Sequence, residues 1–369
     1  MKKKLTAMLI ASAMVLSMAT VPVAAEEGDA LKICIVTSTG VDDGSFNQNC
    51  YEGIQAFLET HPDSSVQDVK ETDMSKLIPT VDDLVGDYDV FVLPGFNFAA
   101  CGDIVTANPD KEFIVVDSTI SDSEGNPIEG DNYYTMTFAE QQSAFPVGVA
   151  AALSSKTGKV AVVNGIAFPS NVNYQYGFMA GVKYANEKYG TEVECVELPS
   201  YAGTDVLGNN VGGNYVGDFG DEATGKIVAQ NLIDEGVDVI LVAAGASGNG
   251  CFAAIKEASD VYVIGCDVDQ WADGVEGDRN IVLTSTLKLM DINVEKQLNA
   301  IADGTFAGED AYLDANNEGV GYVVEDGHHQ MSDDTLEKVA EAFAAMQKGD
   351  VVVPADATVN EYTPDDFPM

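Results

Sequence analysis

Positive charge is scarce in this chain of 369 residues. Eighteen Lys and Arg stand against 60 Asp and Glu, which gives a formal net charge of −42 at pH 7. Arg279 is the only arginine. Because contacts to phosphate groups need Lys and Arg, this composition argues against nucleic acid as a partner. It also argues against direct binding to anionic lipid, whereas it favours solubility.

Histidine and the common catalytic motifs are also scarce. Two of the three histidines, His328 and His329, are adjacent, so their side chains diverge and a histidine metal cluster is not expected. No GxSxG motif of a serine hydrolase occurs. We therefore expect a binding protein with no metal and no cofactor that catalyses no reaction. A nucleoside hydrolase using Asp42, Asp43, Asp267 and Asp269 remains an alternative, although it would need a metal and an N-terminal Asp cluster of different spacing.

A long apolar run is absent after the N-terminus. Lys2 to Lys4 and the apolar run Leu5–Ala19 precede small residues at Val23 and Ala25, which is the pattern of a signal peptide over residues 1–25. The run is too short for a clear membrane span, although an uncleaved anchor is the alternative. We expect an exported, soluble, monomeric protein.

Paired cysteines at short spacing are missing too. The six cysteines form no CxxC motif, and most lie inside apolar runs such as Lys32–Val36. An even number in an exported protein permits disulfides. Burial in apolar runs favours free thiols instead.

What the sequence does contain is a repeated strand-and-helix unit. Apolar, β-rich runs alternate with segments of helical periodicity. Such alternation indicates parallel sheets covered by helices on both faces. The strand-like runs are Leu31–Thr37, Val90–Leu93, Phe113–Val116, Tyr133–Phe138, Val160–Val163, Val239–Ala243, Val261–Ile264 and Ile281–Leu283. The helix-like segments are Ser45–Leu58, Asn97–Thr106, Gln142–Leu153, Tyr174–Lys188, Glu222–Asp234, Gly250–Ala258 and Leu287–Ile301.

So many units exceed one sheet of ordinary size, and the length suits two lobes. We predict an α/β fold of two doubly wound parallel-sheet lobes joined by hinge crossovers, with the ligand cleft between them. The chain changes lobe near Phe138–Gln142 and Thr284–Thr286. The first lobe then comprises residues 26–140 and 285–318, and the second comprises 141–284 and 319–369. The stretch Gly203–Gly220 is rich in Gly and Asn and is predicted to be a loop.

Polar and aromatic residues gather where predicted strands end, which is where open α/β sheets bind ligands. The first such turn, Ser38–Asn47, offers Asp43, Phe46 and Asn47, although Asp43 and Ser45 could simply cap the helix. Gly95 follows another strand and is expected to border the cleft.

The later turns are less specific. Gly245 and Gly248 form a loop that lets backbone N–H groups approach a ligand, although a tight turn explains them nearly as well. Asp267 could bind sugar hydroxyl groups or cap a helix. Lys288 could bind ligand oxygens or pair with Asp267, but a solvated lysine is the ordinary case.

Several motifs, taken in order, resemble the basic membrane protein family, which comprises nucleoside-binding subunits of ABC transporters with a type I periplasmic binding fold. The resemblance runs from about residue 33 to about residue 325. The matching segments are Asp42–Gln48 (DDxSFNQ), Phe145–Ala152, Thr157–Val160, Gly177–Gly181 (GFxAG), Asp238–Gly250, Ile264–Gln270 (IGxDxDQ) and Thr284–Lys288 (TSxxK).

The resemblance implies a nucleoside ligand and a role for each site residue. Phe46 and Phe178 would hold the base between the lobes, and Asn47 and Asp117 would bind its edge. Asp267 and Lys288 would hold the ribose hydroxyl groups, beside the backbone from Gly245 to Gly248. The permease subunits of an ABC transporter would be the protein partner.

The chain departs from the family pattern at three places. Ser38 stands where the family commonly has Asp, and the first turn is one residue shorter. No cysteine precedes Cys34, so we expect no lipid anchor at the signal-peptide cut. The segment Gly203–Gly220 is longer than its family counterpart. A sugar or another small molecule bound by the same fold therefore remains the alternative to a nucleoside.

Overall fold

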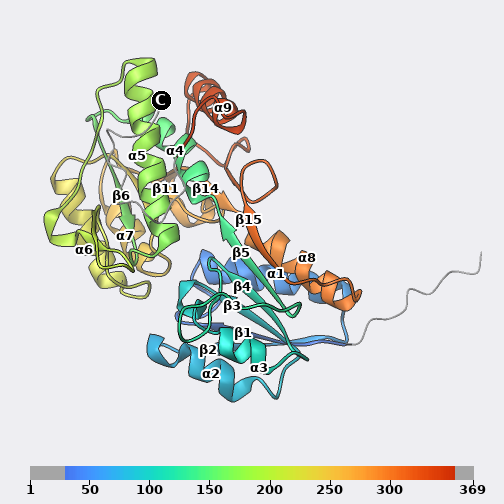
Figure 1. Ribbon diagram of the computed structural model, residues 1–369. Helices are drawn as coiled ribbons and strands as arrows, with labels where there is room; N and C mark the ends of the chain where they lie inside the picture. Colours follow the sequence, from blue (N-terminus) through green and yellow to red (C-terminus); the bar gives the residue numbers. More distant parts are fainter. Residues whose placement is uncertain (1–29, 354–369) are drawn as a thin grey trace, which may run out of the picture.

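The computed structural model describes residues 30–353, and the signal peptide expected over 1–25 lies outside them. The chain forms two lobes, each built around a six-stranded sheet (Figure 1). This confirms the predicted α/β class. No helix within the described residues is long and apolar enough to cross a membrane.

All strands of the first sheet run parallel. Its order is β15 (Glu309–Leu313), β5 (Tyr133–Phe138), β4 (Glu112–Val116), β3 (Val90–Pro94), β1 (Lys32–Thr37) and β2 (Ser65–Lys70). The central strands are buried along nearly their whole length, because helices cover both faces. One face carries α1 (Phe46–Thr60) and α8 (Met290–Ala302), and the other carries α2 (Leu77–Leu84) and α3 (Gly102–Ala107).

The second sheet is parallel apart from its edge strand β16, which runs antiparallel to β14. Its order is β16 (Val320–Tyr322), β14 (Val282–Lys288), β11 (Tyr262–Gly265), β10 (Val239–Ala243), β6 (Lys159–Asn164) and β7 (Glu194–Cys195). One face packs against α4 (Glu140–Ser154), α5 (Pro169–Tyr189) and α9 (Asp333–Gln347), and the other against α6 (Glu222–Asp234) and α7 (Ser247–Glu257).

The chain crosses between the lobes three times, and the crossings lie side by side. It passes from β5 to α4 at Ala139, from β14 to α8 at Leu289, and from β15 to β16 between Leu313 and Val320. The N–H of Ala139 donates to the carbonyl of Leu313 at 2.8 Å, and the N–H of Leu289 donates to that of Gly319 at 2.9 Å. The three crossings are therefore one hydrogen-bonded hinge.

The boundary predicted at 284/285 is wrong. Residues 285–288 continue β14, which pairs with β11 in the second sheet, and α8 begins at Met290 rather than at Leu287. The apolar and polar residues from Leu287 onward fit a helical period, but the strand register with β11 and β16 overrides it.

The segment Gly203–Gly220 is not simply a loop. It contains the hairpin of β8 (Gly203–Thr204) and β9 (Asn210–Gly212), and Tyr215 forms a parallel bridge with Asn164 at the end of β6. The segment thereby extends the second sheet and returns toward the gap between the lobes.

All six cysteines are free thiols, as predicted, and five of them are buried. Burial raises the pKa of both Cys34 and Cys101 to about 12. These thiols are therefore protonated at neutral pH and pack as small apolar groups.

Three glycines bring α4 and α5 into backbone contact. A Cβ on Gly181 would lie 2.1 Å from the carbonyl oxygen of Phe145, and one on Gly148 would lie 2.2 Å from that of Phe178. Gly177 meets the backbone of Gln141 in the same way. The GFxAG segment is therefore a helix-packing motif of the second lobe.

We expect Gly181→Ala to lower the free energy of unfolding by about 1–3 kcal/mol, because the added methyl group must push two helices apart. Gly86→Ala is the matched control, since Gly86 is exposed and a Cβ there meets nothing within 4 Å. Urea unfolding followed by circular dichroism measures both. Equal stability of the two variants would contradict the close helix contact.

Candidate functional site

A cavity opens between the lobes at the carboxyl ends of the strands of both sheets. It holds about 620 Å³ of space, counting the part open to solvent. The first lobe lines it with Ser38, Thr39, Asp43, Phe46, Asn47, Pro94, Gly95, Phe96, Asn97 and Asp117. The second lobe and the hinge add Phe168, Ser170, Asn171, Tyr174, Phe219, Ala243, Gly245, Cys266, Asp267 and Lys288.

The first turn is organised by Asp43. Its carboxylate accepts hydrogen bonds from the backbone N–H groups of Ser45, Asn47 and Gln48 at 3.2, 3.1 and 3.0 Å. Burial raises the pKa of Asp43, and these N–H groups oppose that shift. Asp43 therefore caps the start of α1, which is the simpler of the two roles that the sequence left open, and it fixes the turn that carries Phe46.

Phe46 and Asn47 reach the cavity from this capped turn. The side-chain amide of Asn47 donates to the hydroxyl of Thr39 at 2.7 Å. Phe46 is half-buried, and its ring centroid lies 5.3 Å from the Lys288 nitrogen. An aromatic face near an ammonium group is an attractive arrangement.

A buried ion cluster forms the floor of the site. The Lys288 ammonium lies 2.7 Å from each carboxylate oxygen of Asp117 and 2.9 Å from Oε1 of Glu140. The Lys288, Asp117 and Glu140 side chains are 1%, 6% and 2% exposed, so water screens these charges little. Lys288 is thus a buried ion-pair partner, not the solvated lysine that is the ordinary case.

The cluster shifts the pKa values of its members in ways that follow from its geometry. Burial lowers the pKa of Lys288, but the attraction of Asp117 and Glu140 outweighs it, so the pKa is raised. Burial raises the pKa of Asp117 to about 7, with Lys288 lowering it and Glu140 raising it. Burial is the main cause of the raised pKa of Asp117, and the second carboxylate on the same ammonium group adds to it.

Asp267 lies opposite, at the end of β11. Its two carboxylate oxygens accept hydrogen bonds from the hydroxyls of Tyr174 at 2.9 Å and Ser45 at 3.0 Å. The Ser45 bond joins the lobes, as does the bond from the Gln270 amide to the Gly44 carbonyl at 3.3 Å. Each carboxylate oxygen keeps a second lone pair that a ligand hydroxyl can use.

Asp117 and Asp267 share an uncommon backbone conformation. Their φ angles are 64° and 69°, in the left-handed region that residues other than glycine seldom adopt. Asp117 directly follows β4, Asp267 lies two residues after the end of β11, and both line the cavity. Such backbone strain gathers at functional sites, so the two turns point to the same centre.

A row of aromatic side chains faces the cavity and was not predicted. The ring of Phe168 lies 5.3 Å from that of Phe96 in the opposite lobe and 5.9 Å from that of Phe219. Phe219 packs on Gly165, where a Cβ would lie 2.2 Å from its ring. Phe168 follows a strand just as Phe46 does, so the same positional rule could have found it.

Two predicted site residues do not line the cavity. Phe178 is fully buried in the core of the second lobe, because Gly177 and Gly181 turn this part of α5 toward α4. Gly248 lies in the first turn of α7, where a Cβ would meet Val242 of the core at 2.9 Å. The other nine line it: Ser38, Asp43, Phe46, Asn47, Gly95, Asp117, Gly245, Asp267 and Lys288.

Asp117 and Asn47 both line the cavity. The carboxylate of Asp117 also forms an ion pair with Lys288, a contact that was not predicted. Within residues 30–353 no group of three or more His, Cys, Asp or Glu is arranged to hold a metal ion.

The comparison with known families decides the classification. Residues 30–200 and 209–354 match the sequence profile of the Bmp family, described as ABC transporter substrate-binding protein, PnrA-like. The chain belongs to the Bmp family. It is therefore a solute-binding protein of an ABC transporter, a class that acts outside the cytoplasm. The eight residues between the matched parts, 201–208, include β8.

Related proteins agree with this assignment. The chain is 32% identical over 343 residues to the CD4+ T-cell-stimulating antigen of Listeria monocytogenes, with 87% of each chain covered. It is 28% identical to the ABC transporter nucleoside-binding protein BmpA of Lactococcus lactis, covering 88% of this chain and 89% of the relative. A solute-binding protein of Aeropyrum pernix shares the fold, with a TM-score of 0.75 at 23% identity over 90% of this chain and 95% of the other.

The ion cluster makes a prediction about stability. Lys288→Met leaves two buried carboxylates without a charged partner and should lower the free energy of unfolding by about 3–5 kcal/mol at pH 8. Asp117 has a raised pKa in the folded state, so its protonation favours folding as pH falls from about 7. The loss should therefore be smaller at pH 5.5.

Lys188→Met is the matched control, because Lys188 pairs with Glu341 at 2.9 Å on the surface. An exposed pair contributes about 0–1 kcal/mol. Chemical unfolding at pH 8 and pH 5.5 compares the variants. A Lys288→Met loss that is small, or the same at both pH values, would refute the buried cluster.

Proposed function

We propose that this protein captures a nucleoside in the cleft between its lobes and delivers it, chemically unchanged, to the permease subunits of an ABC transporter. One observation carries the proposal: aromatic side chains from both lobes face the same cavity as a buried cluster of carboxylates and one lysine. A nucleoside combines a flat ring with hydroxyl groups. The ring can stack on the aromatic side chains, and the hydroxyl groups can form hydrogen bonds with the carboxylates and the lysine. The Lactococcus lactis relative is named an ABC transporter nucleoside-binding protein, which supports the same ligand class.

Phe46 from the first lobe and Phe168 or Phe219 from the second are the candidates to hold the base. These replace the pair Phe46 and Phe178 expected from the sequence, because Phe178 is a core residue. Stacking of a base on an aromatic side chain contributes about 1–3 kcal/mol. Asp267, Asp117 and Lys288 are the proposed partners of the ribose hydroxyl groups.

Closure of the lobes completes the site in this proposal. Each lobe carries half of the lining, so a ligand that touches both halves favours the closed arrangement. The Ser45–Asp267 and Lys288–Asp117 contacts join the same surfaces. A single chain supplies the whole lining, and we propose that the monomer is the binding unit.

Identification of the ligand is the direct test. Small molecules released from the purified protein are identified by mass spectrometry, and titration calorimetry then compares nucleosides with monosaccharides. We expect a nucleoside to bind with a Kd of about 1 μM or tighter, which corresponds to about −8 kcal/mol. Binding of monosaccharides alone would replace the nucleoside proposal with the sugar alternative.

Phe46→Ala should weaken nucleoside binding about 5- to 150-fold, the equivalent of one lost stack. Phe178→Leu is the control, because it should lower thermal stability but leave the Kd unchanged. Titration calorimetry together with thermal unfolding separates the two effects. If Phe178→Leu changed affinity and Phe46→Ala did not, the assignment of the aromatic wall would be reversed.

Asp267→Asn tests the hydroxyl partner while keeping the side-chain shape. The wild-type protein should bind inosine more tightly than 2′,3′-dideoxyinosine, by about tenfold or more for hydrogen bonds to a charged group. The variant should lose most of that preference. An unchanged ratio of the two Kd values would remove Asp267 from the ribose contact.

A further inference from the structure

Glu140 is the member of the buried ion cluster that lies outside the cavity lining. It is the first residue of α4, directly after the first chain crossing, and its side chain is 2% exposed. Oε1 lies 2.9 Å from the Lys288 nitrogen, and Oε2 accepts a hydrogen bond from the Asn173 amide at 3.0 Å. Glu140 does not line the cavity. It therefore contacts the lysine from behind the cavity wall.

The ammonium group of Lys288 has three N–H donors. Two short contacts go to the oxygens of Asp117, and one goes to Glu140. A ligand hydroxyl can reach Lys288 only if one of these contacts is given up. Asp117 lines the cavity and Glu140 does not, so the contact that the ligand hydroxyl replaces is one between Lys288 and Asp117.

We propose that Glu140 is a positioning residue of the binding site: it holds the Lys288 ammonium in place from behind, so that a ligand hydroxyl can replace part of the Lys288–Asp117 contact without displacing the lysine. The proposal rests on the proposed function for the identity of the ligand. It assigns Glu140 no contact with the ligand.

The charges around Asp117 set its pKa and therefore the pH dependence of binding. This pH dependence would not change if Glu140 had a purely structural role. Lys288, Glu140, Asp267 and the thiol of Cys50 are the charged or titratable groups that act on Asp117 or feel its charge. Burial, opposed by Lys288 and reinforced by Glu140, raises the pKa of Asp117 to about 7. Removal of the Glu140 charge should therefore lower the pKa of Asp117.

The sign of the pH effect follows. A hydroxyl donates to the ionised form of Asp117, so affinity is complete above its pKa and falls as pH decreases through about 7. In Glu140→Gln the fall should begin at a lower pH. At pH 8.5, where Asp117 is ionised in both proteins, the variant should bind about tenfold more weakly or worse, because the lysine has lost a charged partner.

The experiment is titration calorimetry of the mature protein with inosine and uridine between pH 5.5 and pH 9. Glu341→Gln is the matched control, because Glu341 also lies 2.9 Å from a lysine, but the pair is exposed. The control should match the wild type at every pH. Glu140→Asp keeps the charge at a shorter reach and should retain the wild-type pH midpoint with intermediate affinity, and it serves as the test variant if Glu140→Gln does not fold.

A second measurement does not depend on the ligand. In protein labelled with ¹⁵N-lysine, the buried Lys288 ammonium should give a protected signal that is absent from Lys288→Met and is shifted or lost in Glu140→Gln. Unchanged affinity, an unchanged pH midpoint in Glu140→Gln, or an unchanged Lys288 signal would each overturn the positioning role. Failure of the wild type to bind any nucleoside overturns the proposed function instead, and the signal of Lys288 then decides the role of Glu140.

Discussion

The ammonium group of Lys288 lies where both lobes and two of the chain crossings meet. Lys288 is the last residue of β14 in the second sheet. Its ammonium group contacts Asp117 at the end of β4 in the first sheet and Glu140 at the start of α4. A charge so deeply buried is stable only with close partners of opposite sign. The relative position of the lobes is therefore tied to the same contacts that present Asp117 and Lys288 to the cavity.

Much of the architecture follows from periodicity. The runs at Tyr133–Phe138 and Glu222–Asp234 coincide with β5 and α6. A continuous apolar run and a helical spacing of apolar residues can both be recognised in the local sequence. The edge strand β2 was not predicted, since its residues are mostly exposed and polar. The end of β14 was misplaced because pairing with β11 and β16 decides it, and pairing between distant segments leaves no local signal.

The residues of the candidate site could likewise be predicted only in part. The rule that ligands gather at the carboxyl ends of strands found Phe46 and Asp267 without structural information, and the family resemblance supplied Asp117. It does not reveal which side chains pair, so the Asp117–Lys288 contact was missed, as was Glu140. Phe178 was misassigned because a motif in a helix shows only that a residue is constrained. The constraint here is the close contact of α4 with α5.

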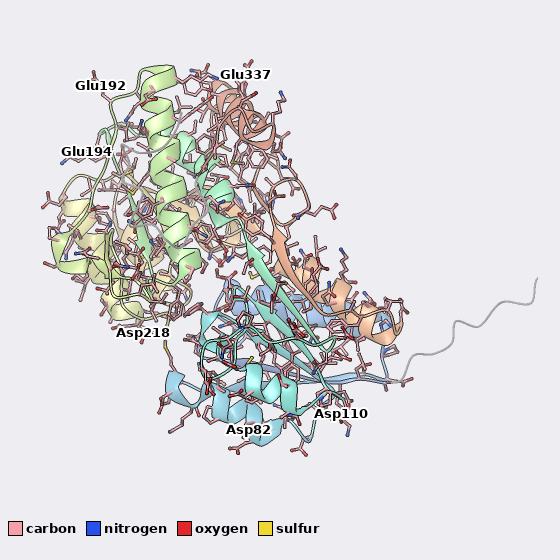
Figure 2. All side chains as sticks on the ribbon, viewed as in Figure 1. Asp82, Asp110, Glu192, Glu194, Asp218 and Glu337 are labelled. Atoms are coloured by element: carbon pink, nitrogen blue, oxygen red, sulfur yellow. The ribbon has the colours of Figure 1, made fainter. Side chains whose placement is uncertain are left out.

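The hinge, made of three chain crossings joined by hydrogen bonds, lies at one side of the cleft and would be the fulcrum of any rotation of the lobes. Asp218 lies in the second lobe near the gap, away from the crossing strands β5 and β15 (Figures 1 and 2). Rotation about such a fulcrum moves nearby groups such as Lys288 little and distant ones most. Rotation of the lobes would therefore open the cleft most beside Asp218, Asp221 and Glu222, which line a second hollow together with Asp42 and a single lysine, Lys70. This excess of carboxylates would disfavour the entry of phosphorylated compounds on that side of the cleft.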